Sequence, residues 1–556
     1  MTQERRLRIF GLVVLLVFGV AWGRAAWLTT VEAKPLTAKL DEGRQPVTLA
    51  APRGQITDRN GIVMAISEAA ADVTANPLQI EDIAATAAKL ATILDLPEAD
   101  LYKKLADGRA KDRGFVYVAR QVSEEQGKAV RELATAGIDT WPTTRRQYPQ
   151  GTVASQLVGS AGVDGDGLSG VEQSLEKTLH GKDGKRLLVR GRGGEKVVYI
   201  KDEQPVEPGK SVKLTIDARI QAKAEEELAT AGTRFGAKSA TAIVMQPSTG
   251  KVLAMANWPK VDANDAAGAP SSARIVQGTN FTYEPGSTFK PFTVAGALEE
   301  KEITPLTSFT LPPVLMVADR PIKESHDRGT IVADTGQILA QSSNIGTVMI
   351  AQRLGKTRFD QWIRKFGFGR RTGVELAREE RGKLIDVGDY SGSSIGNLPI
   401  GQGELVTPIQ LATGYSTFAN DGIRHEPTLV DEVNGVAHKR PAGDRVVSAR
   451  TASEMRAMLE KTSEVGGTAT GAAIKGYDIA TKTGTAQKVA PGSDKYTPGL
   501  YTGSIVGMAP SDRPKIVVAI IVDEPSKEAY YGAEVAGPAF KNLTRWTLNY
   551  LGVAPN

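Results

Sequence analysis

The chain has 556 residues, of which 41% are hydrophobic and 24% are charged, and its formal net charge is +5. This length predicts two or three domains, and a mild charge without any Lys/Arg-rich run argues against nucleic acid as a partner. The chain contains four histidines and no cysteine, which excludes cysteine catalysis, disulfides and thiolate metal sites.

An apolar run near the N-terminus predicts a transmembrane anchor. Residues 9–23 are apolar, Arg24 interrupts the run, and apolar residues continue to Leu28. If Arg24 reaches toward the interface, residues 9–28 are long enough to span a bilayer. Arginines at positions 5, 6 and 8 precede the run, so residues 1–8 are expected in the cytoplasm and the rest outside the cytoplasmic membrane. A cleaved signal peptide is the alternative, but no convincing small-residue cleavage site follows.

Residues 29–209 are predicted to form a mixed α/β pedestal domain. Strand-like pieces at 47–50 and 61–64 precede a helical stretch rich in Ala and Leu around 80–94. Residues 191–209 are charged and rich in turn residues, which predicts a domain boundary. The second domain is therefore expected to cover residues 210–556.

In the second region, strands frame a helical middle. Asp217 can cap a helix, and residues 240–245 and 251–256 alternate around a turn, which predicts a hairpin. Helical segments then dominate from about 287 to 419. Strands are predicted at 478–488, 501–509 and 514–522, and a closing helix at 533–551. We expect an α+β fold with one mostly antiparallel sheet, built from both ends of the region and covered by helices.

Ser-x-x-Lys occurs three times, and one copy differs from the others. The copy at 248–251 lies in the hairpin turn, and the copy at 174–177 is typical of a solvated helix face. In the third copy Pro285-Gly286 breaks the chain, so Ser287 falls in a helix's first turn with Lys290 on the same face. Free N–H groups of that turn can stabilise an anion, and apolar neighbours favour a neutral lysine. Ser287 and Lys290 are the candidate nucleophile and base.

Two further motifs occur once each, Ser342-Ser-Asn344 and Lys482-Thr-Gly484-Thr485. Alone, the first is explained by a loop before a helix and the second by a strand end. All three motifs together, in this order, are far more specific. A second hydroxyl between two lysines can relay a proton, and an amide can hold a peptide bond of the substrate. A strand with a cation and hydroxyls can bind a carboxylate while its backbone pairs with an extended peptide.

Other kinds of site are disfavoured. Residues 392–396 match the Gly-x-Ser-x-Gly elbow of α/β-hydrolases, but no convincing strand precedes them and Pro399 stops any following helix. His425 and His438 follow downstream and are typical of surface histidines. The chain has no His-Glu-x-x-His, no metal-ligand spacing of its histidines and no Walker-type loop. We therefore expect neither a metal nor another cofactor.

The three motifs resemble those of the penicillin-binding proteins and serine β-lactamases. The likeness to class B penicillin-binding proteins covers nearly the whole chain, and it lies in residues 53–61, 146–149, 157–162, 170–172, 249–257, 401–403, 407–411 and 507–510. The Ser342-Ser-Asn344 form and residues 23–27 at the end of the anchor look most like the division-specific, septal enzyme. The elongation-specific enzyme, which often has Asp in place of that Asn, is one alternative, and spore-cortex or secondary class B paralogues would look alike.

This resemblance implies a D,D-transpeptidase domain with a five-stranded antiparallel sheet and helices on both faces. The implied substrate is the D-Ala-D-Ala end of a peptidoglycan stem pentapeptide, and β-lactam antibiotics would acylate Ser287 by mimicking it. Lys290 would take the proton of Ser287. Ser342, with Lys482, would relay a proton to the leaving amine, and Asn344 would hold the substrate amide.

The third motif is the implied substrate-binding strand. Lys482, Thr483, Gly484 and Thr485 form this strand, and the side chains of Lys482, Thr483 and Thr485 would bind the terminal carboxylate. The backbone N–H groups of Ser287 and Thr485 would form the oxyanion hole.

The resemblance also implies partners. The pedestal, a dimerisation-like domain, would contact a membrane peptidoglycan glycosyltransferase and other division proteins. Only about 25 residues separate the anchor from Arg53, too few for a glycosyltransferase domain in this chain. Two alternatives stay open. One is a β-lactamase or carboxypeptidase, in which water takes the acyl group. The other is a non-catalytic β-lactam sensor or division scaffold.

Overall fold

The computed structural model describes residues 3–30, 44–189, 198–490, 492–493 and 495–555. These residues fall into two compact units. The first comprises Met1–Pro52, Glu68–Arg145 and Gly181–Gly209, and the second comprises Arg53–Ser67, Arg146–His180 and Lys210–Asn556. Two segments of the predicted pedestal thus group with the C-terminal region, whereas the domain division at residue 209 stays a prediction.

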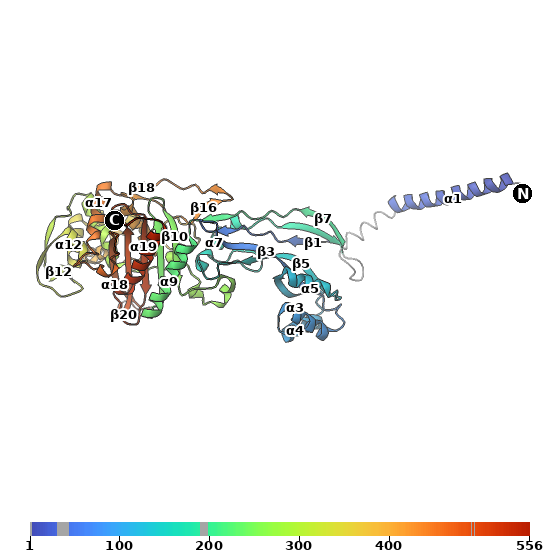
Figure 1. The fold of residues 1–556 in the computed structure, drawn as a ribbon, viewed down its shortest axis with the longest axis horizontal. Coiled ribbons are helices and arrows are strands. Elements are labelled where there is room, and N and C mark those ends of the chain that lie inside the picture. Colours follow the sequence, from blue (N-terminus) through green and yellow to red (C-terminus); the bar gives the residue numbers. More distant parts are fainter. Residues whose placement is uncertain (1–2, 31–43, 190–197, 491, 494, 556) are drawn as a thin grey trace. The chain divides into compact units, whose positions relative to one another are not determined.

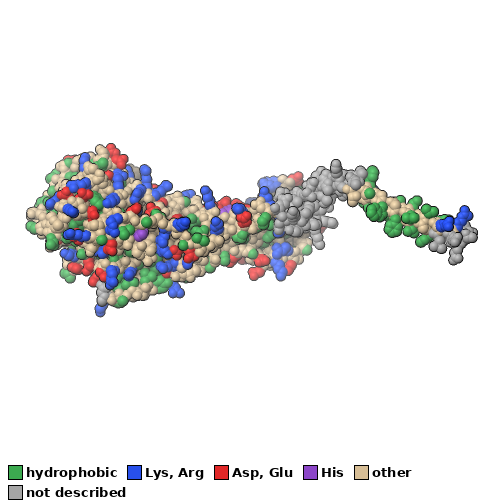
Figure 2. All heavy atoms as spheres, turned by 90° about the horizontal axis from the view of Figure 1, so that it is seen from above, with side chains coloured by type: hydrophobic (Ala, Val, Ile, Leu, Met, Phe, Trp, Pro, Cys, Tyr) green, Lys and Arg blue, Asp and Glu red, His purple; other side chains and the backbone are tan. Residues whose placement is uncertain are grey.

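The first unit begins with helix α1 (Gln3–Thr30), which covers the predicted anchor. Within α1, the 22 residues Arg8–Thr29 are long and apolar enough to cross a membrane, and they are the one such segment in the part of the chain that the structure describes. Figure 2 shows hydrophobic side chains along this helix and basic side chains at its N-terminal end. An apolar surface of this kind is stable in a lipid environment and not in water.

The rest of the first unit contains two strand groups and three helices. Strands β1 (Arg44–Leu49), β6 (Gly184–Val189) and β7 (Val198–Gln204) form an antiparallel sheet. Strand β3 (Val63–Ala75), which belongs to this unit from Glu68 on, pairs with β4 (Val116–Ser123) and with β5 (Ile138–Gln147), which belongs to it up to Arg145. Helices α3 (Ile83–Leu94), α4 (Glu98–Ala110) and α5 (Glu124–Glu132) pack their apolar side chains against β3 and β4. The predicted helix at 80–94 is α3. Strand β3 is much longer than the piece expected at 61–64. The sequence did not predict the rest of this strand because its alanine-rich part lacks the residues that favour strands.

The core of the second unit is a five-stranded antiparallel sheet, in which Figure 1 labels β10 and β20. The strand order is β10-β9-β21-β20-β19. Its strands are β9 (Ser239–Gln246), β10 (Lys251–Trp258), β19 (Ala480–Val489), β20 (Tyr496–Ala509) and β21 (Ile516–Asp523). The predicted hairpin is β9 and β10, and the three predicted C-terminal strands complete the sheet. The fold expected from the sequence is confirmed.

The central strand β21 explains why this sheet is covered on both faces. Its residues alternate between two hydrophobic cores: Val517, Ala519 and Ile521 enter one core, and the residues between them enter the other. Successive side chains of a strand point to opposite faces, so an unbroken apolar run requires cover on both. Helices α9 (Ala218–Phe235) and α19 (Gly537–Tyr550) cover one face, and α11 (Lys290–Glu299), α16 (Pro408–Ala419) and α17 (Ala449–Glu460) lie on the other.

Two predicted helices differ in detail from those found. The Asp217 side chain accepts hydrogen bonds from the first turn of α9, as expected of an N-cap, but α9 extends past Ala231 to Phe235. The predicted closing helix is two helices, α18 (Gly532–Val535) and α19. Proline at the start of α19 explains the second start, because proline favours the first turn of a helix and not its interior.

The remaining elements of the second unit are short or peripheral. Its other strands are β2 (Ile56–Thr57), β8 (Val212–Leu214), β11 (Ser308–Leu311), β12 (Val314–Val317), β13 (Arg320–Lys323), β14 (Ile331–Asp334), β15 (Ile423–Arg424), β16 (Val430–Val433), β17 (Val436–Ala437) and β18 (Asp444–Arg445). Its other α-helices are α6 (Ser155–Val158), α7 (Gly170–Ser174), α8 (Glu176–Leu179), α10 (Gln277–Asn280), α12 (Thr335–Ala340), α13 (Asn344–Leu354), α14 (Lys356–Lys365) and α15 (Ser394–Asn397). The 3₁₀ helices are η1 (Ala263–Gly268), η2 (Ser271–Ala273), η3 (Gly286–Phe289), η4 (Val387–Asp389), η5 (Leu398–Ile400) and η6 (Thr470–Ala472).

A buried ion network joins the N-terminal segments of the second unit. The Arg53 Nη2 and Arg146 Nε atoms lie 2.8 and 2.6 Å from the carboxylate of Glu172, whose side chain is 0% exposed. Arg53 also pairs with Glu176 at 2.8 Å. Three of the sequence stretches that resemble class B penicillin-binding proteins thus meet at one buried carboxylate, where fixed geometry offsets the cost of burying charge.

Candidate active site

The candidate nucleophile lies in a 3₁₀ turn and not in the first turn of an α-helix as predicted. Ser287 belongs to η3, and α11 begins directly afterwards at Lys290. Gly286 has φ of +55°, which glycine adopts without steric cost and which sets the sharp entry to the turn. In a 3₁₀ helix, residues i and i+3 eclipse one another, so Ser287 and Lys290 still share a face.

The Lys290 amine is fully buried and is held by the second motif. Its Nζ donates hydrogen bonds to Ser342 O at 2.5 Å, Asn344 Oδ1 at 2.7 Å and Ser342 Oγ at 3.3 Å. Burial lowers the pKa of Lys290 to about 7, although the carboxylate of Glu324 opposes this change. An amine in this environment can be neutral near physiological pH, as a general base must be. No hydrogen bond joins Ser287 Oγ to Lys290 Nζ among the described residues.

The second motif occupies the break between α12 and α13. Ser342 has φ of +58°, a left-handed conformation that is uncommon for serine and that carries backbone strain. Ser343 caps α13, since its Oγ accepts the N–H of Gly346 at 2.9 Å. Asn344 is the first residue of α13, and its side chain turns back to Lys290. The expected loop before a helix is therefore present, and it also brings a hydroxyl and an amide to the buried amine.

The third motif lies on β19, which is the edge strand of the five-stranded sheet. Lys482 is fully buried and donates to Thr483 O at 3.1 Å. Burial, and then the neighbouring Lys290, hold the pKa of Lys482 well below its usual value. Thr485 Oγ1 accepts the N–H of Gly532 at 2.9 Å. An edge strand has backbone groups that no neighbouring strand pairs, so it can receive an extended peptide.

One cavity of about 410 Å³ brings the three motifs together. Six of the eight predicted site residues line it: Ser287, Ser342, Asn344, Thr483, Gly484 and Thr485. The two lysines, Lys290 and Lys482, are buried behind its wall. The cavity is also lined by Gln402, from the stretch 401–403, and by residues that the sequence did not indicate, which include Ser325, His326, Thr468, Tyr531 and Glu534. The residues that the sequence did not indicate lie far apart along the chain, in loops and at α18, so no local sequence pattern shows that they meet.

A loop after η5 supports the turn that carries Ser287. The N–H of Gly286 donates to Gly401 O at 3.0 Å, and Tyr283 and Val406 exchange two backbone hydrogen bonds. A Cβ on Gly401 would lie 2.2 Å from Gly286 O, so only glycine allows this approach. This explains Gly401 in the stretch that the sequence singled out.

Two acidic residues, the buried Glu404 and the half-buried Glu284, lie in the same loop and turn. Glu404 is 0% exposed, and neither of its carboxylate oxygens has a hydrogen-bond partner. Glu284 accepts from Gly403 N at 3.1 Å and from Tyr496 Oη at 2.8 Å. Burial, together with the charge of Glu284, raises the pKa of Glu404 well above its ordinary value. Glu404 is therefore most stable as a neutral acid.

The competing motifs fail on local geometry. Lys251 begins β10 directly after the hairpin turn that holds Ser248, whereas Ser174 and Lys177 fall in two separate short helices. The Gly-x-Ser-x-Gly stretch at 392–396 follows the 3₁₀ helix η4 and enters a helix of four residues, so the strand–turn–helix context is missing. His425 and His438 line a different cavity.

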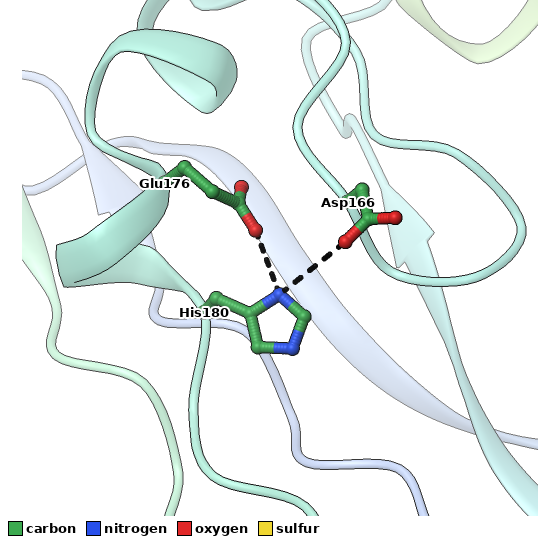
Figure 3. Close-up of side chains that lie close together, drawn as sticks. All are labelled: Asp166, Glu176 and His180. Atoms are coloured by element: carbon green, nitrogen blue, oxygen red, sulfur yellow. Dashed lines mark hydrogen bonds and ion pairs between the residues drawn. The ribbon is translucent and has the colours of Figure 1, made fainter.

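Asp166, Glu176 and His180 form the one close group of potential metal ligands among the described residues, with ligand atoms within 4.8 Å of one another (Figure 3). His180 Nδ1 lies 2.7 Å from Glu176 Oε1 and 3.9 Å from Asp166 Oδ1. Glu176 Oε2 already accepts from Arg53 and from the N–H of Gly167, both at 2.8 Å. Because Arg53 compensates the charge of Glu176, an ion-pair network explains this group better than a cation site.

Comparison with known proteins identifies both halves of the chain. The family model "Penicillin binding protein transpeptidase domain" matches residues 240–545, and "Penicillin-binding Protein dimerisation domain" matches residues 48–214. The peptidoglycan D,D-transpeptidase FtsI of Escherichia coli K12 is 31% identical over 549 residues, covering 98% of this chain and 91% of the relative. Stage V sporulation protein D of Bacillus subtilis is 31% identical over 561 residues, covering 98% and 85%.

Solved structures agree with this assignment. The crystal structure of penicillin binding protein 3 from Mycobacterium tuberculosis complexed with aztreonam has a TM-score of 0.72 and 28% identity, and it covers 92% of this chain and 98% of that chain. Sequence, fold and cavity thus lead to the same conclusion: the chain belongs to the class B penicillin-binding proteins, a family of serine D,D-transpeptidases of peptidoglycan.

Proposed function

We propose that Ser287 of this chain is acylated by the D-Ala-D-Ala end of a peptidoglycan stem peptide and that the acyl group then passes to a neighbouring strand. The observation that carries this proposal is the buried Lys290 amine, which lies three residues after Ser287 and bonds to both Ser342 and Asn344. A serine hydroxyl is a weak nucleophile unless a base takes its proton. Lys290 is that base, because burial keeps its amine able to be neutral.

In the acylation step, Ser287 Oγ forms a bond to the carbonyl carbon between the two D-alanines while its proton moves to Lys290. The N–H groups of Ser287 and Thr485 stabilise the resulting oxyanion. When the intermediate collapses, the bond to the terminal D-alanine breaks, and Ser342, with Lys482, delivers a proton to the departing amine. Asn344 holds the substrate amide.

The donor peptide binds along β19. An extended peptide pairs with the unpaired backbone edge of this strand, and Lys482, Thr483 and Thr485 bind the terminal carboxylate, with Gly484 leaving room for close approach. In the second step, the amine of an acceptor side chain forms a bond to the acyl carbon and gives up a proton. The bond between this carbon and Ser287 Oγ then breaks, and Oγ takes up a proton. A β-lactam acylates Ser287 in the same way.

The cellular setting follows from α1. Basic residues before the apolar helix favour a cytoplasmic N-terminus, which puts both following units outside the cytoplasmic membrane with the cell wall. We propose that the enzyme acts in the septum with a membrane glycosyltransferase and other division proteins, as the Ser342-Ser-Asn344 form and residues 23–27 suggest. Equal identity to FtsI and stage V sporulation protein D leaves this choice to experiment.

Covalent labelling tests the chemistry. Membranes that contain the full chain are labelled with a fluorescent penicillin, and the adduct is mapped by peptide mass spectrometry. We expect one adduct, on Ser287, and none in the Ser287→Ala variant. An adduct on another residue would refute the assignment of the nucleophile. Hydrolysis of the acyl-enzyme within seconds would instead favour a β-lactamase or carboxypeptidase.

Depletion tests the cellular role. Cells depleted of the protein should form filaments if it acts in the septum, and Ser287→Ala should fail to restore division. Restoration by that variant would favour a non-catalytic scaffold. Rounded cells would favour an elongation-type enzyme, and a defect confined to spores would favour a spore-cortex enzyme.

A further inference from the structure

The carboxylate of Glu324, a residue in none of the three motifs, lies at the N-terminal end of α13. Its Oε2 accepts the N–H of Asn344 at 2.7 Å, and its Oε1 accepts Ser343 Oγ at 2.6 Å and the N–H of Ile345 at 3.3 Å. The side chain is 9% exposed and forms an ion pair with Arg328. A carboxylate that holds the free donors of a first helical turn stabilises that turn as a cap, here supplied from a distant segment.

The residue before Glu324 fixes the amide of Asn344. Asn344 Nδ2 donates to Lys323 O at 2.9 Å, and Lys323 is the last residue of β13. With its nitrogen held there, the amide directs Oδ1 to Lys290 Nζ at 2.7 Å. Residues 323 and 324 therefore hold both the backbone and the side chain of Asn344, which contacts the candidate base.

Glu324 also acts on Lys290 by charge. Among the described residues, two charged groups interact electrostatically with Lys290: Lys482 from β19 and Glu324 from the segment after β13. The Glu324 charge favours the protonated amine and opposes burial. Glu324 acts on Lys290 in this way although it is also paired with Arg328. A general base must accept a proton during the reaction. A buried amine without a negative charge nearby accepts this proton poorly.

We propose that Glu324 is a positioning residue for acylation, which aims Asn344 at Lys290 and supports proton uptake by Lys290 through its negative charge. This inference rests on the proposed function, because it gives Glu324 a task in the reaction of Ser287. Glu324 would contribute through its negative charge and through the length of its side chain, and different substitutions can remove each of these independently.

The test uses the full-length, detergent-solubilised chain and three variants. Glu324→Gln removes the charge and keeps the length of the side chain, whereas Glu324→Asp keeps the charge and loses reach. The matched control is Glu299→Gln. Glu299 similarly holds the start of α17, with Ser448 N at 3.1 Å and Thr451 Oγ1 at 2.5 Å, but it does not influence Lys290.

The readout is the second-order rate constant of labelling by a fluorescent penicillin between pH 5.5 and 9. We expect Glu324→Gln to move the midpoint of the acid limb down by about 0.5–1 pH unit, which is at or below the lower end of the effect of an adjacent opposite charge, about 1–3 units. Glu324→Asp should keep the wild-type midpoint and lose about tenfold or more of the plateau rate, because Asn344 is then misplaced. Glu299→Gln should keep the wild-type midpoint, whatever its thermal stability.

The outcomes separate this inference from the proposed function. If every variant labels Ser287 with the midpoint and the plateau rate of the wild type, the proposed role of Glu324 is wrong. The transpeptidase assignment is not affected by that result. An equal shift of the midpoint in Glu299→Gln also overturns it. If Glu324→Gln does not fold, the plateau of Glu324→Asp decides. Absence of labelling in the wild type refutes the proposed function itself.

Discussion

The pH dependence of acylation is the sharpest test of the chemistry assigned to Lys290. The amine is fully buried, and burial lowers its pKa from 10.5 to about 7. This difference is about 3.5 pH units, which corresponds to about 5 kcal/mol against the charged amine. With a pKa near 7, about one amine in eleven is neutral at pH 6 and about ten in eleven at pH 8.

Labelling of Ser287 by a fluorescent penicillin should therefore slow about tenfold between pH 8 and pH 6. The assay is the initial rate at several penicillin concentrations, with membrane-free enzyme and constant ionic strength. The pKa of Lys482 is also lowered, in part by the charge of Lys290, so the two amines titrate together. The observed midpoint therefore describes the pair of lysines and not Lys290 alone. Lys290→Met should lose the reaction at every pH. A rate that stays flat between pH 6 and pH 8, or a midpoint above pH 9, would refute Lys290 as the neutral base.

The same shift has a consequence for stability. The pKa of Lys290 is lower in the folded protein than in the unfolded chain, so between about pH 7 and 10.5 the unfolded chain binds more protons at this amine than the folded protein does. The free energy of unfolding should therefore fall as the pH decreases from about 10.5 toward 7. Lys290→Met should flatten this slope in urea titrations, and an unchanged slope would contradict the burial of a neutral amine.

Three further predictions follow from buried or strained groups. Burial raises the pKa of Glu404, so the folded protein loses stability as the pH rises above the pKa of this group in the unfolded chain. Glu404→Gln should therefore raise the Tm at pH 8 and change it less at pH 5. Equal changes of the Tm at both pH values would contradict this prediction. Ser342→Gly should keep or raise the Tm, because φ of +58° suits glycine, while penicillin labelling falls about 100-fold; a lower Tm would argue against strain there. Glu172→Ala leaves Arg53 and Arg146 without their buried partner and should cost about 3–5 kcal/mol in urea unfolding, whereas a cost below about 1 kcal/mol would mean that the network is solvated.

Local chemistry made much of the catalytic region predictable from sequence. The alternating apolar residues of the hairpin and the unbroken apolar run of β21 predicted strands, and a sheet framed by helices followed from their order. The cap at Asp217 and the Pro285-Gly286 break also depend on neighbouring residues alone. The 3₁₀ geometry of Ser287 differed from the predicted α-helical turn, yet it preserved the shared face with Lys290.

Other features depend on residues far apart in the chain. Arg53, Arg146 and Glu172 stood in three separate stretches, and only folding showed that one buried carboxylate joins them. The segments 53–67 and 146–180 were expected in the pedestal and group with the catalytic unit. Glu324 gave no signal at all, because a glutamate twenty positions before Asn344 is indistinguishable from a solvated charge.

The sequence by itself determined which groups this protein has for acyl transfer, namely a serine, two lysines, a second serine, an asparagine and a hydroxyl-bearing strand. Dihedral preferences, caps and side-chain periodicity depend on near neighbours, so they can be read from a short stretch. Apolar neighbours already predicted a neutral Lys290, but the tertiary structure alone decided that both lysines are completely buried and that the charge of Glu324 acts on Lys290. The burial of a side chain and the charges that act on it depend on all residues packed around it, and these residues come from distant parts of the chain.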